Sequence, residues 1–215
     1  MVTLQLKQVT IPAGGRVFLT GIGWREFEEI LEELGESRSS RLAYYQGTLE
    51  IIMPLPEHEK VKVIIGNLLA ILLDELSIDW EPYGSTTFKR QDMNAGIEPD
   101  DCFSIQNASR MIGKRRIDLA IDPPPDLAIE VDVTSKTQLS AYEALGVPEI
   151  WRYENNRLKI SILRDGQYLD SPISPTFLDF PVLESIERFL AIAFSEGTSS
   201  ALRDFRRWIR ERKQD

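Results

Sequence analysis

The sequence contains only one cysteine, Cys102, and only one histidine, His58. A single cysteine excludes an internal disulfide framework and is typical of a reducing compartment, so we expect a cytoplasmic protein. Zinc sites built on several His and Cys ligands are excluded as well. Any metal site must therefore use oxygen ligands, which favour a hard cation such as Mg²⁺ or Mn²⁺.

Long apolar runs and excess positive charge are also lacking. No run approaches the roughly 18–20 apolar residues of a membrane-spanning helix, so we expect no membrane contact. Lys and Arg number 25 against 34 Asp and Glu, for a net charge of −9. An acidic surface repels phosphate backbones, so binding to nucleic acid would require local basic patches.

Two local basic patches are present. Arg203, Arg206, Arg207 and Arg210 fall on one stripe of a predicted C-terminal helix. We interpret this stripe as a solvated helix face that pairs with acidic neighbours. Lys114-Arg115-Arg116 lies in a predicted loop between two acidic segments, where a phosphate-binding role and a solvated loop are equally compatible with the sequence.

Those acidic segments are the most informative part of the chain: Glu98-Pro99-Asp100-Asp101 and residues 126–132. In the second, Leu127, Ile129 and Val131 alternate with acidic residues and Ala128, which predicts a strand with Asp126, Glu130 and Asp132 on one face. Carboxylates two residues apart repel one another and raise each other's pKa unless a cation lies between them. The pattern predicts a divalent-metal site.

The spacing of apolar residues predicts mixed α/β structure in a single domain, residues 1–215. Residues 1–20 are expected to form short strands and residues 166–215 a C-terminal helical extension. Helices are expected from Trp24 to Gly35, from Pro56 to about Leu76, and from a cap at Thr134 or Ser135 to Gly146. Hairpins are expected at residues 42–53 and 149–163, and further strands near residues 79–89 and 97–105. The order of the elements favours a largely contiguous sheet rather than a doubly wound fold.

An ordered set of short motifs over residues 22–165 resembles one bacterial family. The motifs are Tyr45 to Glu50 before Met53-Pro54, His58, Gly84 to Arg90, Glu98-Pro99-Asp100, Asp126 to Asp132, and Tyr142 to Trp151. They resemble the Uma-type endonuclease family, within the PD-(D/E)xK nuclease superfamily. The resemblance implies a restriction-endonuclease-like fold, in which a mixed central sheet is flanked by helices.

The resemblance also implies a site. Asp100 matches the acidic residue after proline and Glu130 the second carboxylate, so both are the expected metal ligands. The superfamily pattern has lysine two residues after Glu130, where this chain has Asp132. Lys136, at the start of the next helix, is the candidate for the missing cation. Asp100, Glu130, Asp132 and Lys136 are the candidate catalytic residues, whereas His58 is interpreted as a structural group that bonds near its helix start.

The resulting hypothesis is a Mg²⁺- or Mn²⁺-dependent endonuclease that hydrolyses phosphodiester bonds. DNA is the more expected partner than RNA, and the resemblance implies a homodimer, because two active sites address two strands. The alternative is a non-catalytic binding or regulatory protein that keeps the nuclease fold, favoured by the acidic charge and by the absent motif lysine.

Overall fold

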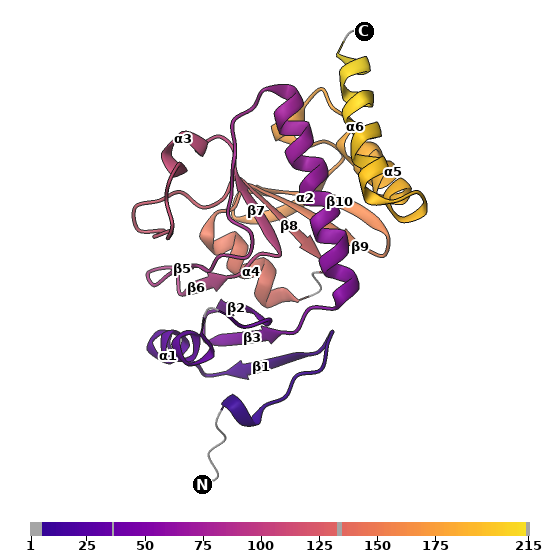
Figure 1. Cartoon of the computed structure of the whole chain (residues 1–215). Helices are drawn as coiled ribbons and strands as arrows, with labels where there is room; N and C mark the ends of the chain where they lie inside the picture. The colour runs from indigo at the N-terminus through magenta and orange to yellow at the C-terminus, as the bar shows by residue number, and fades with distance from the viewer. Residues whose placement is uncertain (1–5, 36, 133–134, 214–215) are drawn as a thin grey trace.

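The fold consists of two sheets with one helix between them. The structure, a computed structural model, describes residues 6–35, 37–132 and 135–213 (Figure 1). The larger sheet has six strands in the order β11-β10-β9-β8-β7-β4. These strands are β4 (Glu81–Pro82), β7 (Asp101–Ser104), β8 (Leu127–Val131), β9 (Glu149–Glu154), β10 (Arg157–Arg164) and β11 (Gln167–Ser171). The pair β8–β9 is parallel and the others are antiparallel, so this sheet is mixed, as the resemblance implies.

The second sheet has five strands in the order β1-β3-β2-β6-β5, all antiparallel. They are β1 (Arg16–Thr20), β2 (Arg41–Tyr45), β3 (Thr48–Ile52), β5 (Phe88–Arg90) and β6 (Ala95–Ile97). The strands of residues 42–53 and 149–163 form the two expected hairpins. The sheet predicted as largely contiguous is thus divided in two, because the chain between β4 and β7 leaves the larger sheet to form β5 and β6.

One helix lies between the two sheets, and the other long helices cover their outer faces. α4 (Lys136–Leu145) packs against β2, β3 and β6, and its buried residues share one apolar cluster with Ala128 of β8 and Ile150 of β9. α2 (Pro56–Leu76), α5 (Val182–Ser195) and α6 (Thr198–Arg212) cover the opposite face of the larger sheet. α1 (Trp24–Leu34) covers the outer face of the smaller sheet (Figure 1). Three single turns complete the fold: 3₁₀ turns at Leu6–Gln8 and Pro175–Phe177, and α3 (Ala108–Met111).

α2 begins and ends where its sequence predicts. Pro56 occupies the first turn, where a missing N–H leaves no intrahelical hydrogen bond unmade, and Glu57 and Glu59 complement the helix dipole. Most of its later residues are buried. A Cβ at Gly66 would lie 2.6 Å from Oδ2 of Asp101, so a larger residue there would require the Asp101 side chain to move. α2 thus lies directly on β7, with its first turn beside the acidic segments.

Two expectations for the chain ends and one for β8 need adjustment. Within the described part of residues 1–20 there is one strand, β1, preceded by a 3₁₀ turn; residues 1–5 lie outside the described residues. The expected C-terminal helical extension begins with a strand, β11, before its two helices. Of the three acids expected on one face of a strand, only Glu130 lies on β8, which is buried between α4 and α2; Asp126 precedes the strand and Asp132 follows it.

Candidate active site

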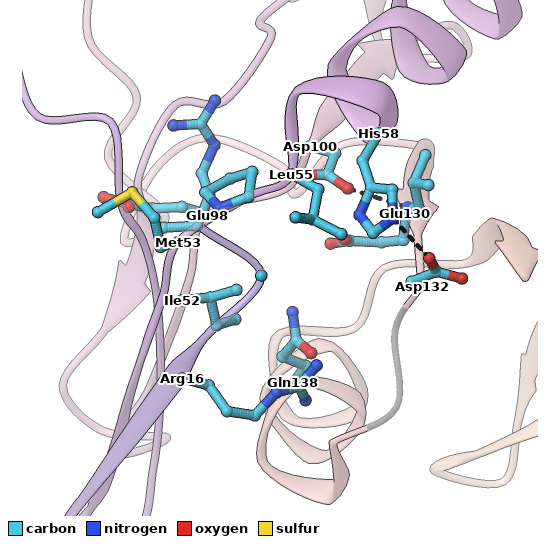
Figure 2. Close-up of a pocket in the computed structure, with 14 residues that line it drawn as sticks. Arg16, Ile52, Met53, Leu55, His58, Glu98, Asp100, Glu130, Asp132 and Gln138 are labelled. Atoms are coloured by element: carbon cyan, nitrogen blue, oxygen red, sulfur yellow. Dashed lines mark hydrogen bonds and ion pairs between the residues drawn. The ribbon is translucent and has the colours of Figure 1, made fainter. Parts of the chain in front are cut away.

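A pocket of about 80 Å³ lies where the C-terminal end of β8 meets the first turn of α2 and the smaller sheet (Figure 2). That volume has room for a cation with a few waters, since one water requires about 10–15 Å³ measured in this way. Its polar lining side chains come from seven elements or their flanks: Arg16, Arg41, His58, Glu98, Asp100, Glu130, Asp132 and Gln138. The pocket therefore joins three of the four predicted catalytic residues.

Asp100 and Glu130 both line the pocket, where the Asp100 charge acts on the Glu130 carboxyl group and helps to raise its pKa. The N–H of Val131 donates to Oδ2 of Asp100 at 2.9 Å, and the Tyr142 hydroxyl of α4 donates to Oε1 of Glu130. Asp101, next in the chain, faces α2 instead, against Gly66. The alternation of strand side chains thus selects Asp100 for the pocket.

Burial raises the pKa of both central carboxyl groups. For Glu130 the increase is large, and the Asp100 charge adds to it. For Asp100 the Val131 N–H and the charges of Lys62 and Arg41 partly oppose the effect of burial. Among the described residues neither acid forms an ion pair, and a divalent ion bound between two such buried acids would stabilise their charged forms.

The donor set fits Mg²⁺ or Mn²⁺. Both ions accept carboxylate oxygens, and Mg²⁺ is commonly held by one or two carboxylates while waters and substrate phosphates complete its shell. Among the described residues, no group of three or more His, Cys, Asp and Glu side chains is placed to hold a metal. Asp100 and Glu130 would thus be the protein's ligands, with the remaining positions left to water and substrate.

Asp132 departs from the strand that carries Glu130. β8 ends at Val131, and Asp132 adopts a left-handed backbone with φ of 58°, uncommon for a residue other than glycine. Its N–H donates to the Tyr153 carbonyl, and its Oδ2 lies 2.8 Å from Nε2 of His58 (Figure 2). The three acids predicted to stack are therefore separated, and His58 binds the carboxylate at the site rather than its own helix start.

Lys136 does not line the pocket, although it opens α4 as predicted. Its side chain is exposed, and among the described residues it makes no ion pair or hydrogen bond. Gln138 lines the pocket instead and is buried. Residues two apart on a helix are separated by about 200°, so the two side chains take opposite faces. The catalytic role of Lys136 stays a prediction that its placement does not support.

The sequence interpretation missed Gln138 and the position of His58. A usable signal was Tyr142: Gln138 precedes it by four residues, so the two share a helix face, and Tyr142 reaches Glu130. For His58 the signal was its place in the first turn of a helix that follows Met53-Pro54, since Met53 and Pro54 also line the pocket.

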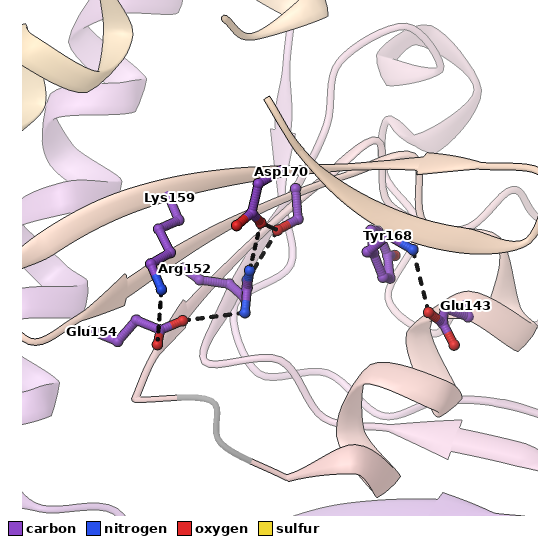
Figure 3. Close-up of polar contacts among 7 residues, drawn as sticks. Glu143, Arg152, Glu154, Lys159, Tyr168 and Asp170 are labelled. Carbon is purple, nitrogen blue, oxygen red and sulfur yellow. Dashed lines mark hydrogen bonds and ion pairs between the residues drawn. The ribbon is translucent and has the colours of Figure 1, made fainter. Parts of the chain in front are cut away.

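Arg152 is the register partner of Glu130 on β9, which makes it the nearest cation by sheet geometry. Its guanidinium is engaged elsewhere: it donates to Ser161 at 3.0 Å, to Glu154 at 3.2 Å and to Asp170 at 2.7 Å (Figure 3). Arg152 thus ties β9 to β10 and β11 and does not replace the motif lysine.

Two further arginines line the pocket. Arg16 pairs with buried Glu50 at 3.3 Å, and Glu50 also accepts from Ser135, the cap of α4. Arg41 lies 3.8 Å from Glu59, and its buried Nε has no hydrogen-bond partner among the described residues. Arg41 therefore keeps donor capacity at a pocket whose proposed ligand is anionic.

The other acids near the site are already satisfied. Glu98 is buried and accepts from Arg38, from Thr87 and from the N–H of Leu42. Asp126, at the opposite end of β8, accepts from the N–H of Ile105 at 2.7 Å and from Asn107. These acids support the structure, and only Asp100 and Glu130 are left facing each other.

Part of each basic patch is engaged in ion pairs. Arg206 and Arg210 bind Glu75 at the end of α2, and Arg207 pairs with Asp204. This confirms the interpretation of the stripe as a face that pairs with acidic neighbours. Lys114 binds Asp122 within its own loop. Among the described residues, no helix is both long and apolar enough to cross a membrane.

Comparison with known proteins identifies the family and a similar fold. Residues 24–195 match the model of the Uma2 family, described as "Putative restriction endonuclease". The chain is also similar to a solved structure described as a putative nuclease belonging to DUF820 from Anabaena variabilis ATCC 29413. Identity is 16%, the match covers 79% of this chain and 99% of that chain, and the TM-score is 0.51. No curated protein matches. The family and the fold thus support a nuclease.

Proposed function

We propose that this chain, which belongs to the Uma2 family, is a deoxyribonuclease that uses Mg²⁺ or Mn²⁺ held by Asp100 and Glu130. The observation that carries the proposal is the buried pair itself. The carboxyl group of Glu130 on β8 and that of Asp100, just before β7, line one pocket, and burial raises the pKa of both. Removing such charges from water is unfavourable unless a cation compensates for them.

A divalent ion bound there would neutralise phosphate charge and lower the pKa of a bound water. The protein's own groups hold the carboxylates in place. The Val131 N–H orients Asp100, and the Tyr142 hydroxyl orients Glu130. Arg41, with its unpartnered Nε, and Arg16 supply positive charge on the pocket wall for an entering phosphate. We also propose that the protein acts in the cytoplasm as a homodimer and that its substrate is DNA rather than RNA.

The test is cleavage of supercoiled and linear DNA with Mg²⁺ or Mn²⁺, beside an EDTA control and the variant Glu130→Ala. We expect metal-dependent cleavage that falls by about 1,000-fold or more in the variant, because a ligand of the ion is lost. Circular dichroism and a melting curve check that the variant keeps its fold. Full activity of folded Glu130→Ala would refute the assignment.

A second candidate is a binding or regulatory protein that keeps the nuclease fold. The observation that favours it is the missing motif cation: Asp132 stands in the lysine position, Lys136 is exposed outside the pocket, and Arg152 is engaged on the sheet. Well-folded protein that binds DNA but cleaves neither DNA nor RNA with any tested metal would support this candidate.

A further inference from the structure

The only histidine of the chain lies in the pocket that holds the two central acids. His58 is the third residue of α2, and its side chain lines the pocket with Asp100 and Glu130. Figure 2 shows the imidazole of His58 extending from the first turn of α2 toward the part of the pocket that contains Asp100, Glu130 and Asp132. An imidazole, which can take up or give a proton, therefore lies beside the proposed reaction centre.

Asp132 fixes the orientation of this imidazole. Its Oδ2 lies 2.8 Å from Nε2 of His58. The backbone of Asp132 takes a left-handed conformation at this point, with its N–H held by the Tyr153 carbonyl. A non-glycine residue enters that region only at a free-energy cost, and such residues gather at functional sites. The residue at the motif lysine position is thus used to hold the histidine.

The 2.8 Å contact between Oδ2 of Asp132 and Nε2 of His58 determines which nitrogen carries the proton. A carboxylate only accepts hydrogen bonds, so Nε2 carries the proton in the neutral imidazole and Nδ1 keeps its lone pair. Among the described residues, none hydrogen-bonds Nδ1 of His58. An imidazole held on one side by a carboxylate and open on the other is the arrangement that general bases use in hydrolytic enzymes.

We propose that His58 is the general base of the hydrolysis and that Asp132 is its positioning residue. Nδ1 takes one proton from a water molecule as the water oxygen forms a bond to phosphorus. The bond from phosphorus to the leaving oxygen breaks with its electron pair on that oxygen, which takes a proton from solvent. The imidazolium, stabilised by Asp132, then returns its proton to solvent. This inference rests on the proposed function and replaces the role assigned to Lys136 by sequence.

The experiment measures single-turnover cleavage of plasmid DNA by the full chain at saturating Mg²⁺. The variants are His58→Ala, His58→Gln, Asp132→Ala and Glu130→Ala. His58→Gln still donates a hydrogen bond to Asp132, so it serves if His58→Ala does not fold. Glu57→Gln, an exposed residue one position before His58, is the matched control. Each reaction is repeated with added imidazole and over a series of Mg²⁺ concentrations.

We expect His58→Ala and His58→Gln to slow the cleavage step by about 100-fold to 10,000-fold, with unchanged dependence on DNA and Mg²⁺ concentration. Free imidazole should restore part of the rate of His58→Ala and none of the rate of Glu130→Ala. Asp132→Ala should lose about 10-fold, because the base remains but is no longer oriented. Glu57→Gln should cleave at the wild-type rate.

Three outcomes overturn the inference while the proposed function stands. The first is cleavage at the wild-type rate by both His58 variants. The second is that folded His58→Ala cleaves slowly and added imidazole does not restore its rate. The third is that the His58 variants need more Mg²⁺ but reach an unchanged maximal rate. The last would make His58 a metal ligand. If the wild-type protein cleaves no nucleic acid at all, the proposed function fails first, and the role of His58 fails with it.

Discussion

Asp126 directly precedes β8 and Glu130 lies on it near the other end. Both residues are almost fully buried, with 6% and 2% of their surface exposed. Asp126 accepts hydrogen bonds on both oxygens, from the Ile105 N–H and from two groups of Asn107. Glu130 accepts one from the Tyr142 hydroxyl and otherwise faces Asp100. Burial therefore does not distinguish a structural acid from a functional one, whereas the supply of donors does.

The largest effect is expected when Asp126, whose carboxylate accepts several hydrogen bonds, is removed. Asp126→Ala should lower the free energy of unfolding by about 3 kcal/mol, because the buried Ile105 N–H loses its partner. Cleavage per folded molecule should stay unchanged, in contrast to Glu130→Ala. Urea titration measures the stability, and exposed Asp179→Ala is the control, with an expected change within about 0.5 kcal/mol. Loss of activity in folded Asp126→Ala would contradict the division of roles.

Metal addition should affect only the poorly satisfied pair. Mg²⁺ at about 100 times its dissociation constant should stabilise the wild-type protein by about 2.7 kcal/mol, since the ion binds the folded state. EDTA should reverse the effect, and Glu130→Gln should lose it. Melting curves at matched ionic strength measure this. An equal Mg²⁺ response in the wild type and in Glu130→Gln would place the ion elsewhere.

In metal-free protein, Glu130→Gln should raise the free energy of unfolding by about 1 kcal/mol, because functional sites carry groups that are unfavourable for stability. The amide nitrogen can donate to Asp100 while the amide oxygen accepts from Tyr142. Glu149→Gln is a matched control with the opposite expected sign. Glu149 is equally buried but accepts from Trp151 at 2.6 Å and Thr176 at 2.7 Å, so one donor would lose its acceptor. Chemical denaturation in EDTA measures both, and destabilisation by Glu130→Gln would contradict the interpretation.

Glu50 sharpens the comparison as an intermediate case and has the smallest expected effect. Burial raises its pKa above 4.5, and Ser135 and Arg16 only partly oppose this. The folded state therefore binds the proton more tightly than the unfolded chain, so stability falls as pH rises from the unfolded pKa through the folded one. Glu50→Gln should lose less stability than the wild type as the pH rises above about 4.5. Identical pH dependence of the two proteins in urea titrations would contradict this.

Much of the fold could be predicted because its signals are local. Pro56 and the acids of the first turn define the start of α2, Ser135 and Gly146 define the ends of α4, and the hairpin at residues 42–53 turns at Gly47. Each depends on the conformational preference of a few neighbouring residues. The division into two sheets was not predictable in this way, because strand pairing joins residues far apart in the chain.

Some residues of the candidate site could be predicted from local sequence, whereas others were decided by packing. Asp100 and Glu130 follow from a motif and from strand alternation, and the pocket contains both. The prediction for Lys136 assumes that a lysine at the start of the next helix reaches back to the site, but the rotation of α4 turns it outward and brings in Gln138. Distance along a chain predicts proximity only within one element, and this site is assembled from several.

By itself, then, the sequence determined the elements, the fold family and the acidic pair, since periodicity, caps and short motifs are read along the backbone. Only the tertiary structure decided which charges meet. It brought His58 from α2 to Asp132 beyond β8, engaged Arg152 on β9 to β11, and left Asp100 and Glu130 facing each other. The physical reason is that hydrogen bonding and desolvation depend on neighbours in space, and those neighbours are set by packing between distant segments.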